Sequence, residues 1–242
     1  MRYKITFSYD GSGFHGFQKQ NGKRTVQEEI EKVLSSINDA PVKIIGAGRT
    51  DSGVSATFQV AHFDFDKDIT LYKLKSALNS YLPNDIYIKK VEEVSNDFHA
   101  RYMVKLKIYE YKINTLEYNP IHRNQEFQYC KTLNVDKMKE AVKYFVGVHD
   151  FTSFASAQDK REDKVREIVS AKVLFKDGII TIVFKGKGFI KYQVRNMVGM
   201  LIKIGEGKYE PTCIKTILDE KDRTKASINA PAEGLTLVKI EY

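Results

Sequence analysis

Hydrophobic and polar residues alternate along several short stretches of the chain, a pattern typical of strands that bury one face. In the first stretch, residues 3–9, four large hydrophobic residues alternate with polar ones. Further strands are predicted at 42–46, 59–65, 86–94, 106–114, 167–175, 179–185 and 235–242. The Asp177-Gly178 pair between two of them predicts a hairpin turn, because both residue types tolerate positive φ.

Hydrophobic residues that recur every three or four positions predict five helices. The first extends from residue 26 to residue 38, and five residues form its buried face: Val26, Ile30, Val33, Leu34 and Ile37. Thr25 and Glu28 have the spacing of a capping box, in which a hydroxyl and a carboxylate accept from free amides at a helix start. The other helices are predicted at 71–82, 134–145, 192–204 and 211–219, with Thr70 and Asn134 as caps of the first two.

The order of these elements indicates the fold class. Each half of the chain mixes strands with helices, and few helices separate successive strands. This arrangement favours an α+β fold with a mostly antiparallel sheet, helices on one face and the other face open to a ligand. No low-complexity linker divides the halves, so two domains, 1–100 and 101–242, are expected to share an interface.

The distribution of charge along the chain indicates what kind of partner the protein binds. Lys and Arg total 39 against 31 Asp and Glu, a formal net charge of +8. The surplus lies in two stretches: residues 1–25 carry five basic groups and one acidic group, and residues 185–225 carry ten and five. If folding brings these stretches together, they form a basic face suited to phosphates, although a soluble protein can also be basic without such a partner.

Cysteine content and the length of hydrophobic runs exclude several classes of protein. Cys130 and Cys213 lie far apart and outside any paired motif, which argues against a disulfide framework and a cysteine-rich zinc site. The stretch MRYKITFSYDG lacks the hydrophobic segment of a signal peptide, and no run of about 18 hydrophobic residues suggests a membrane span. We therefore expect a cytoplasmic protein.

The most unusual stretch is 46–54, Gly-Ala-Gly-Arg-Thr-Asp-Ser-Gly-Val, which follows a predicted strand. Its three glycines allow tight turns and close approach to a ligand, and Arg49 can pair with Asp51 and keep it ionised. The same pattern also fits a surface turn with a local ion pair. It is not a P-loop, because no Gly-Lys-Ser/Thr follows, and Asp51 replaces the third glycine of a dinucleotide fingerprint.

Residues 47–54 resemble the catalytic motif of the bacterial tRNA pseudouridine synthase A family, which modifies positions 38, 39 and 40 in the anticodon stem-loop. Further blocks resemble that family in the same order: 9–12 with 14–20, 25–28, 79–86, 98–101 (Phe-His-Ala-Arg), 109–111 (Tyr-Glu-Tyr), 150–154, 194–199 and 232–235. The resemblance covers nearly the whole chain. The chain is short for that family, and Ser55 and Phe17 stand where the family usually has His and Trp, which leaves open a shifted tRNA preference.

The resemblance implies a pseudouridine synthase fold: two ferredoxin-like or RRM-like halves share one sheet, with an active-site cleft opposite the helices. It implies that Asp51 is the catalytic carboxylate, that Arg49 helps to displace the target nucleotide, and that Tyr109 stacks on it. Tyr109 also fits a strand aromatic that faces the core, and Tyr111 lies on the same face. Arg195 has hydrophobic neighbours that read as buried, so we expect it to be half-buried and to pair with Asp51.

The implied reaction breaks the bond from ribose to N1 of uracil, turns the base and rejoins it through C5. No redox change or external group is involved, so we expect neither a cofactor nor a metal. The carboxylate can act as nucleophile or as base toward the ribose. Lys19, Lys23 and Arg24 are expected to contact RNA phosphates. Three histidines are scattered without metal-ligand spacing and are expected to be structural: His62, His99 and His122.

The partners implied by the resemblance are tRNA and a second copy of the chain in a homodimer. Two alternatives stay open: a non-catalytic RNA-binding protein on the same scaffold, and a pseudouridine synthase for another RNA such as rRNA. A zinc-dependent nucleobase deaminase is excluded, because the chain has neither the His-x-Glu nor the Pro-Cys-x-x-Cys that such an enzyme requires.

Overall fold

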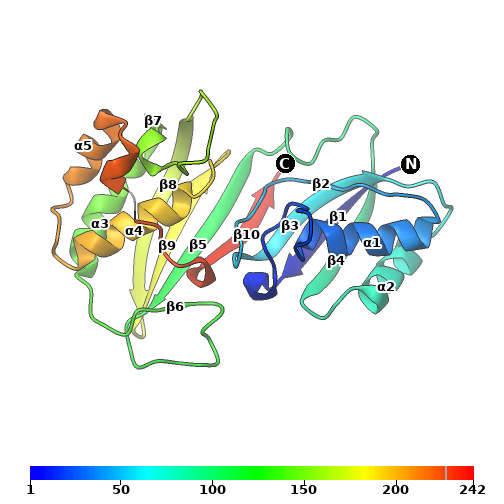
Figure 1. The fold of residues 1–242 in the computed structure, drawn as a ribbon, viewed down its shortest axis with the longest axis horizontal. Coiled ribbons are helices and arrows are strands. Elements are labelled where there is room, and N and C mark those ends of the chain that lie inside the picture. Colours follow the sequence, from blue (N-terminus) through cyan, green and yellow to red (C-terminus); the bar gives the residue numbers. More distant parts are fainter. Residues whose placement is uncertain (227) are drawn as a thin grey trace. The chain divides into compact units, whose positions relative to one another are not determined.

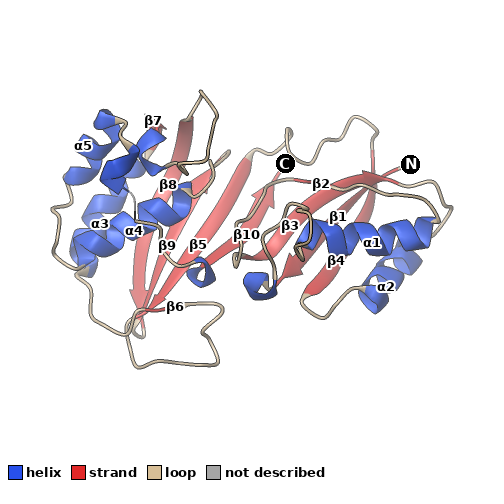
Figure 2. Cartoon of the chain, viewed as in Figure 1, coloured by secondary structure: helices blue, strands red, loops and turns tan. Residues whose placement is uncertain are grey.

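The chain folds into two compact units in a computed structural model that describes residues 1–226 and 228–242 (Figures 1 and 2). Unit 1 comprises Met1–Lys105 with Leu237–Tyr242, and unit 2 comprises Leu106–Thr236. The domain boundary expected at residue 100 stays a prediction, because compactness alone does not show that either unit folds independently.

Unit 1 is an antiparallel sheet with two helices on one face (Figure 1). Strand β1 (Arg2–Tyr9) lies between β4 (Ile86–Val94) and β3 (Ser55–Asp64) and is antiparallel to both. The short β2 (Ile45–Gly46) pairs with β3, and β10 (Leu235–Glu241) follows β3 in the strand order. The helices are α1 (Val26–Asn38) and α2 (Leu71–Tyr81), and α2 packs on β4.

The core of unit 1 lies between that sheet and its helices. Ile5 and Phe7 of β1 are fully buried, as the alternation in the sequence predicts. Ile30 and Leu34 of α1 are buried with them, and so are Leu74 and Leu78 of α2. Burial of each such side chain contributes about 1.5–3 kcal/mol relative to exposure, so this layer of apolar contacts holds the helices on the sheet.

Two sequence predictions in unit 1 are wrong, and both involve backbone groups near α1. Thr25 is the N-cap of α1, but its buried hydroxyl has no hydrogen-bond partner among the described residues. The capping box does not form, because the carbonyls of Gly16 and Phe17 accept from the first amides of the helix instead, at 3.3 and 2.9 Å. The strand predicted at 42–46 is confined to Ile45–Gly46.

The shortening of that strand has a local cause. The amide of Val42 donates to the Ser35 hydroxyl at 2.8 Å, and the amide of Ile44 donates to the Glu31 carboxylate at 3.0 Å. Both acceptors belong to α1, so these backbone donors are used by helix side chains and are not available to a sheet ladder.

The strands of unit 2 lie in the order β5 (Leu106–Asn114), β9 (Ile179–Gly186), β8 (Val165–Lys176) and β7 (Gly147–Asp150), each antiparallel to its neighbour. The two-residue β6 (Phe127–Gln128) is parallel to β5. The predicted hairpin between β8 and β9 is confirmed, with φ of 49° at Asp177 and 76° at Gly178. Strand β7 follows no alternation that predicts it.

The helices of unit 2 are α3 (Val135–Ala141), α4 (Gln193–Gly205) and α5 (Cys213–Glu220). The predicted helix 134–145 is thus shorter than expected and continues as a 3₁₀ helix, Val142–Phe145. The Asn134 cap is confirmed, since its side chain accepts from the Lys137 amide at 3.0 Å; Thr70 caps α2 in the same way at 3.3 Å. Short 3₁₀ helices occupy Gly11–Gly13, Thr152–Phe154, Arg223–Ala226 and Ala232–Gly234.

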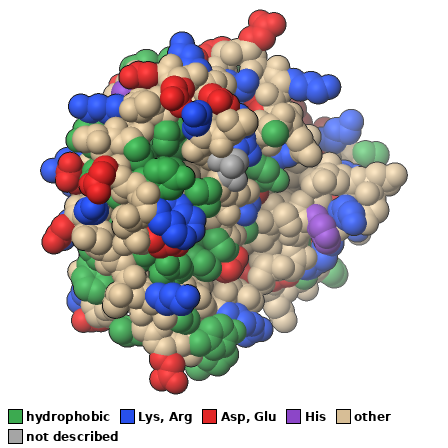
Figure 3. All heavy atoms as spheres, turned by 60° about the vertical axis from the view of Figure 1, so that its left-hand side comes forward, with side chains coloured by type: hydrophobic (Ala, Val, Ile, Leu, Met, Phe, Trp, Pro, Cys, Tyr) green, Lys and Arg blue, Asp and Glu red, His purple; other side chains and the backbone are tan. Residues whose placement is uncertain are grey.

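The predicted α+β class with mostly antiparallel strands is confirmed in both units. None of the described helices is both long enough and apolar enough to cross a membrane. Basic and acidic side chains are interspersed on the face shown in Figure 3. In the basic stretch 185–225, for example, Glu206 lies 2.9 Å from the ammonium of Lys203 and 2.7 Å from that of Lys208.

Candidate active site and the pocket beside it

Asp51 lies in the irregular loop 46–54 that connects β2 to β3. Its side chain is half-buried, and its carbonyl accepts from the amide of Val54 at 3.1 Å, which closes a turn around Ser52 and Gly53. A carboxylate in this position is reachable from solvent while the backbone beneath it is fixed.

The glycine-rich loop 10–24 holds the Asp51 loop in place. The amide of Phe17 donates to the carbonyl of Thr50 at 3.1 Å. In the opposite sense, the carbonyl of Phe14 accepts from the Gly53 amide at 3.3 Å and from the Ser52 hydroxyl at 3.2 Å. Residues on both sides of Asp51 are therefore hydrogen-bonded to loop 10–24. These hydrogen bonds fix the backbone position of Asp51.

A buried polar network supports the Asp51 loop from below. The hydroxyls of Tyr9 and Thr50 are 2.8 Å apart, and the side-chain amide of Gln59 donates to the carbonyl of Gly48 at 3.1 Å and to the Tyr9 hydroxyl at 3.5 Å. Burial raises the pKa of Tyr9 to about 12, so its hydroxyl keeps its proton at neutral pH. Each of these buried groups has a partner, as a rigid polar network requires.

Gly11 and Ser55 show how closely the two loops approach each other. A Cβ at Gly11 would lie 2.2 Å from the carbonyl oxygen of Val54, so only glycine fits there. The amide of Gly11 donates to the Ser55 hydroxyl at 3.0 Å. Ser55, one of the departures from the family pattern, thus joins the loops through its side chain.

The two other predicted substrate-binding residues belong to unit 2. Arg195 is half-buried on α4, as expected; its Nε donates to the carbonyl of Ala230 at 2.7 Å, and its guanidinium lies 5.4 Å from the ring centroid of Tyr192. Tyr192 adopts a left-handed conformation, with φ of 65°. The pairing of Arg195 with Asp51 stays a prediction.

Tyr109 and Tyr111 point to the same face of β5 and are both buried, with exposed fractions of 7% and 0%. The Tyr111 hydroxyl donates to the carbonyl of Pro231 at 2.8 Å, which makes this residue part of the core. Tyr109 packs edge-to-face against Phe189, with centroids 5.2 Å apart. Its role in stacking on a nucleotide stays a prediction.

The three predicted RNA-contact residues differ in how they are engaged. Arg24 forms a bidentate pair with Asp85 at 2.7 and 2.9 Å, and its guanidinium lies 4.1 Å from the Phe14 ring centroid. It therefore has a structural function, since it braces the loop. Lys19 lies 3.8 Å from the Glu28 carboxylate, and Lys23 is exposed in a tight turn. Contact of all three with phosphates stays a prediction.

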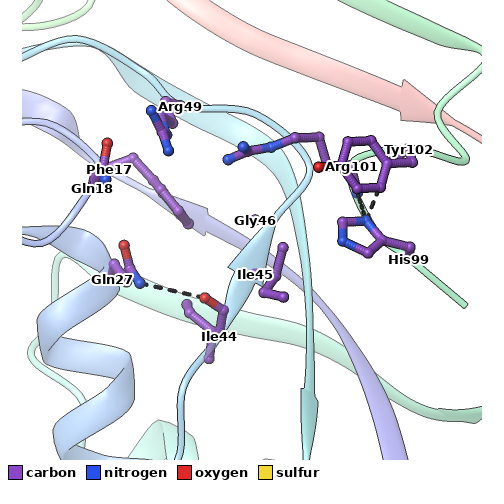
Figure 4. A pocket seen from close by; sticks show the side chains of 10 residues that line it. All are labelled: Phe17, Gln18, Gln27, Ile44, Ile45, Gly46, Arg49, His99, Arg101 and Tyr102. Carbon is purple, nitrogen blue, oxygen red and sulfur yellow. Dashed lines mark hydrogen bonds between the residues drawn. The ribbon is translucent and has the colours of Figure 1, made fainter. Parts of the chain in front are cut away.

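Arg49 lies on a pocket of about 300 Å³ within unit 1 (Figure 4). Ten residues line it: Phe17, Gln18, Gln27, Ile44, Ile45, Gly46, Arg49, His99, Arg101 and Tyr102. The sequence predictions missed the last two members of this set, Arg101 and Tyr102, as site residues. A signal was present in the Phe-His-Ala-Arg block at 98–101, which we expected only to be part of a family pattern.

Two of the histidines that are far apart in the sequence lie close together in the structure. The rings of His62 and His99 lie 4.9 Å apart, and the ring of His99 stacks on Tyr102 at 4.1 Å. Among residues 1–226 and 228–242, no group of three or more His, Cys, Asp or Glu side chains is arranged to hold a metal ion.

The chain matches the family described as tRNA pseudouridine synthase over residues 5–103 and 141–242. It is 45% identical to tRNA pseudouridine synthase A 2 of Bacillus thuringiensis over 242 residues, which cover 99% of each chain. It is 46% identical to tRNA pseudouridine synthase A of Streptococcus agalactiae over 245 residues, covering 100% of this chain and 95% of that protein.

A third relative, tRNA pseudouridine synthase A of Streptococcus uberis, is 45% identical over 245 residues, with 100% of this chain and 98% of the relative covered. The likeness therefore extends across both units, and the family match includes the Asp51 loop as well as helix α4. The chain belongs to the tRNA pseudouridine synthase family, the isomerases that make pseudouridine in tRNA.

Proposed function

We propose that this protein isomerises uridine to pseudouridine at positions 38, 39 and 40 in the anticodon stem-loop of tRNA, with the carboxylate of Asp51 as the catalytic group. The observation that carries the proposal is the construction of the Asp51 loop. The residues on both sides of this half-buried carboxylate are bonded to loop 10–24. Such fixed geometry is what a single catalytic group needs to meet a displaced nucleotide.

The reaction is an isomerisation, so its atoms balance without another reactant. The bond from ribose C1′ to N1 of uracil breaks, the base turns, a bond from C1′ to C5 forms, and the proton on C5 is replaced by one on N1. Asp51 acts either as the nucleophile that holds the ribose during this turn or as a base toward the ribose. Neither role requires a cofactor or a metal.

Access to the bond requires that the uridine leave the stacked stem, which costs a few kcal/mol. We assign Arg49 to this step, because it is exposed on the same loop as Asp51, two residues away. Tyr109 would stack on the displaced base, and Arg195 would keep Asp51 ionised. Lys19, Lys23 and Arg24 would contact phosphates and strengthen binding at low salt.

The proposal includes a cytoplasmic location and a homodimer in which one tRNA contacts both copies. A monomer mass by light scattering at micromolar concentration would refute the homodimer, but it would not affect the assignment of Asp51 as the catalytic group.

The test is Asp51→Asn, assayed on unmodified transcripts of tRNAs that carry uridine at one of the three positions. We expect single-turnover formation of pseudouridine to fall by about 10³-fold or more, because the variant lacks the only group assigned to bond cleavage. Binding of the transcript should change little. Asp39→Asn is the matched control, since Asp39 is an exposed carboxylate at the end of α1.

Near wild-type turnover by Asp51→Asn would overturn the assigned mechanism. Absence of pseudouridine with the wild-type protein would instead favour the non-catalytic RNA-binding alternative. A map of pseudouridines in RNA from cells that lack the protein separates tRNA from rRNA as the substrate: loss of pseudouridine only in rRNA would overturn the assignment to tRNA.

A further inference from the structure

The pocket beside the Asp51 loop has the form of a binding site. Its base is apolar, since Phe17 and Ile44 are 2% and 3% exposed, and its rim is polar. Figure 4 shows Phe17, Gln18 and Gln27 on one side and His99 with Tyr102 on the other. A volume of about 300 Å³ lies at the lower end of the range in which proteins hold small ligands. Asp51 is not among the ten residues that line it.

Two arginines give this pocket its charge. In Figure 4 the side chain of Arg101 extends toward Arg49. The Arg101 guanidinium makes no hydrogen bond or ion pair with another side chain in the part of the chain that the structure describes. No Asp or Glu lines the pocket. A guanidinium such as that of Arg101, in a pocket without a lining carboxylate, forms a site for an anion, and its planar fork matches phosphate oxygens.

An aromatic surface adjoins the arginines. Tyr102 is 75% exposed, and one face of its ring stacks on His99, with centroids 4.1 Å apart and an interplanar angle of 26°. Tyrosine rings exposed in this way are platforms on which nucleobases stack with little sequence preference. The pocket thus combines the two groups that recognise a nucleotide, a guanidinium for the phosphate and a ring for the base.

The turn that carries these side chains is fixed by two imidazoles. Nδ1 of His62 accepts from the amide of Ala100 at 3.1 Å. Nδ1 of His99 accepts from the amides of Arg101 and Tyr102 at 3.2 and 3.3 Å, which assigns the ring proton of His99 to Nε2. Three consecutive amides are therefore bonded to imidazole nitrogens, so the ring of Tyr102 and the stem of Arg101 start from a preorganised backbone.

We infer that this pocket is a subsite for one nucleotide of the RNA substrate, a neighbour of the uridine that reacts at Asp51. The base of that nucleotide stacks on Tyr102, and its phosphate is held by Arg101. The inference rests on the proposed function, because it takes tRNA as the ligand. His62 and His99 are positioning residues, since they act through the backbone of the turn and not on the RNA.

The size of the site decides which form of RNA enters it. A pocket of about 300 Å³ accommodates one unstacked nucleotide and not a base-paired stem. Single-stranded loops are where proteins find such unstacked bases. The subsite therefore stabilises RNA in which a second base, besides the reacting uridine, has left its stack.

The absence of tryptophan from the chain permits a direct optical test. Tyr102→Trp, combined with Asp51→Asn to stop turnover, places a single indole on the proposed platform. Titration with an unmodified tRNA transcript should quench its fluorescence by about half, because a base stacks on the ring. Tyr72→Trp with Asp51→Asn is the matched control: Tyr72 is 81% exposed on α2 and does not line the pocket, so its signal should stay constant.

Affinity measurements test the cationic part independently. Arg101→Gln should raise the Kd for the transcript about tenfold and reduce the slope of log Kd against log salt by about 1. The single-turnover rate at saturating tRNA should fall less than the Kd rises. Lys73→Gln, which removes one positive charge from α2, should change Kd by less than about twofold. Arg101→Lys should fall between wild type and Arg101→Gln, since it keeps the charge but loses the fork.

Either of two results overturns the subsite. One is constant indole fluorescence from the Tyr102→Trp protein at a transcript concentration that saturates binding by gel shift. The other is an Arg101→Gln protein that binds the transcript as Lys73→Gln does.

Failure of the proposed function has a different signature. If wild type makes no pseudouridine in tRNA but the transcript still quenches the indole introduced by Tyr102→Trp, the enzymatic assignment fails and the subsite stands. If wild type is active and the fluorescence of that indole does not change, the subsite fails alone.

Discussion

Two loops of unit 1, residues 46–54 and 96–103, position functional side chains by different chemistry. The Asp51 loop is held by hydroxyl and amide groups, through the network of Tyr9, Thr50 and Gln59 and the bonds to Phe14. Loop 96–103 is held by the imidazoles of His62 and His99. Arg2 also donates to the carbonyl of Phe98 at 3.1 Å.

The difference determines how each loop responds to pH. Hydroxyls and amides do not titrate near neutrality, so the bonds around Asp51 persist wherever the protein is folded. An imidazole accepts at Nδ1 only while that nitrogen is unprotonated. Protonation of His62 in acid therefore removes the acceptor of the Ala100 amide, and the two loops can be separated by experiment.

The largest expected effect comes from the point where the Asp51 loop is packed most tightly. Gly11→Ala places a methyl group 2.2 Å from the carbonyl oxygen of Val54, so a loop must move. We expect a loss of about 3 kcal/mol in the free energy of unfolding, measured by urea denaturation at pH 7. Gly188→Ala is the control, because no atom lies within 4 Å of its new Cβ. Equal stability of the two variants would refute the close approach of the loops.

The second prediction concerns pH and the other loop. Burial, with a smaller contribution from Arg2 and from His99, lowers the pKa of His62 from 6.5 to about 4, while Asp64 opposes the shift. Between these values the unfolded state binds a proton that the folded state does not. The stabilisation is therefore complete above pH 6.5 and is lost as the pH falls toward 4. From pH 7 to pH 5 this one group removes about 2 kcal/mol.

The measurement for that group is urea denaturation of wild type and His62→Asn at a series of pH values. The asparagine carbonyl can still accept from the Ala100 amide, but it does not titrate. Between pH 7 and pH 5 the variant should therefore lose about 2 kcal/mol less of its free energy of unfolding than wild type does. His15→Asn is the control, because His15 is exposed. An unchanged acid dependence in His62→Asn would contradict the assigned role of the imidazole.

A smaller effect is expected from the polar network under Asp51. Tyr9→Phe leaves the buried Thr50 hydroxyl without its partner at 2.8 Å, which should lower stability by about 1.5 kcal/mol. The loss should be the same at pH 5.5 and pH 7.5, in contrast to the His62 effect. Tyr87→Phe, at a tyrosine that is 53% exposed on β4, should have little effect. A pH-dependent loss in Tyr9→Phe would break the distinction between the loops.

The smallest effect is expected at the junction of loops 10–24 and 46–54. Ser55→Ala removes the hydroxyl that accepts from the Gly11 amide at 3.0 Å. Water can replace this partner in a half-buried position, so stability should fall by about 0.5 kcal/mol. Ser12→Ala, at an exposed serine nearby, is the control in thermal unfolding. A loss as large as that of Tyr9→Phe would mean that Ser55 is essential to the pairing of the loops.

Local signals explain which parts of the fold could be predicted from the sequence. Alternation placed β1, and the turn chemistry of Asp177-Gly178 placed the β8–β9 hairpin, because each depends on neighbouring residues only. Thr70 and Asn134 cap helices as expected. Thr25 does not, because carbonyls of a loop that folds back over the helix start satisfy the same amides.

In the candidate site, too, residues that are contiguous in the sequence could be predicted, and residues that only the tertiary fold brings together could not. The motif around Asp51 is contiguous and could be recognised as a unit, and its chemistry is a proposal that follows from it. His62 and His99 are 37 residues apart, and no local sequence pattern around either histidine predicts that they are in contact. Their meeting depends on β3 and on the turn after β4, so only the tertiary fold brings them together. The pocket with Arg101 and Tyr102 escaped prediction for that reason.

The placement of residues 237–242 in unit 1 has a consequence for synthesis. Within that unit Lys105 donates its amide to the carbonyl of Glu241 at 2.9 Å, and the Tyr242 hydroxyl donates to the carbonyl of Ala100 at 2.7 Å. The ribosome must translate all of unit 2 before these partners exist. Unit 2 is continuous in the sequence and can assemble while it emerges. Translation therefore begins with unit 1 but leaves the turn before Arg101 incomplete until Tyr242 arrives.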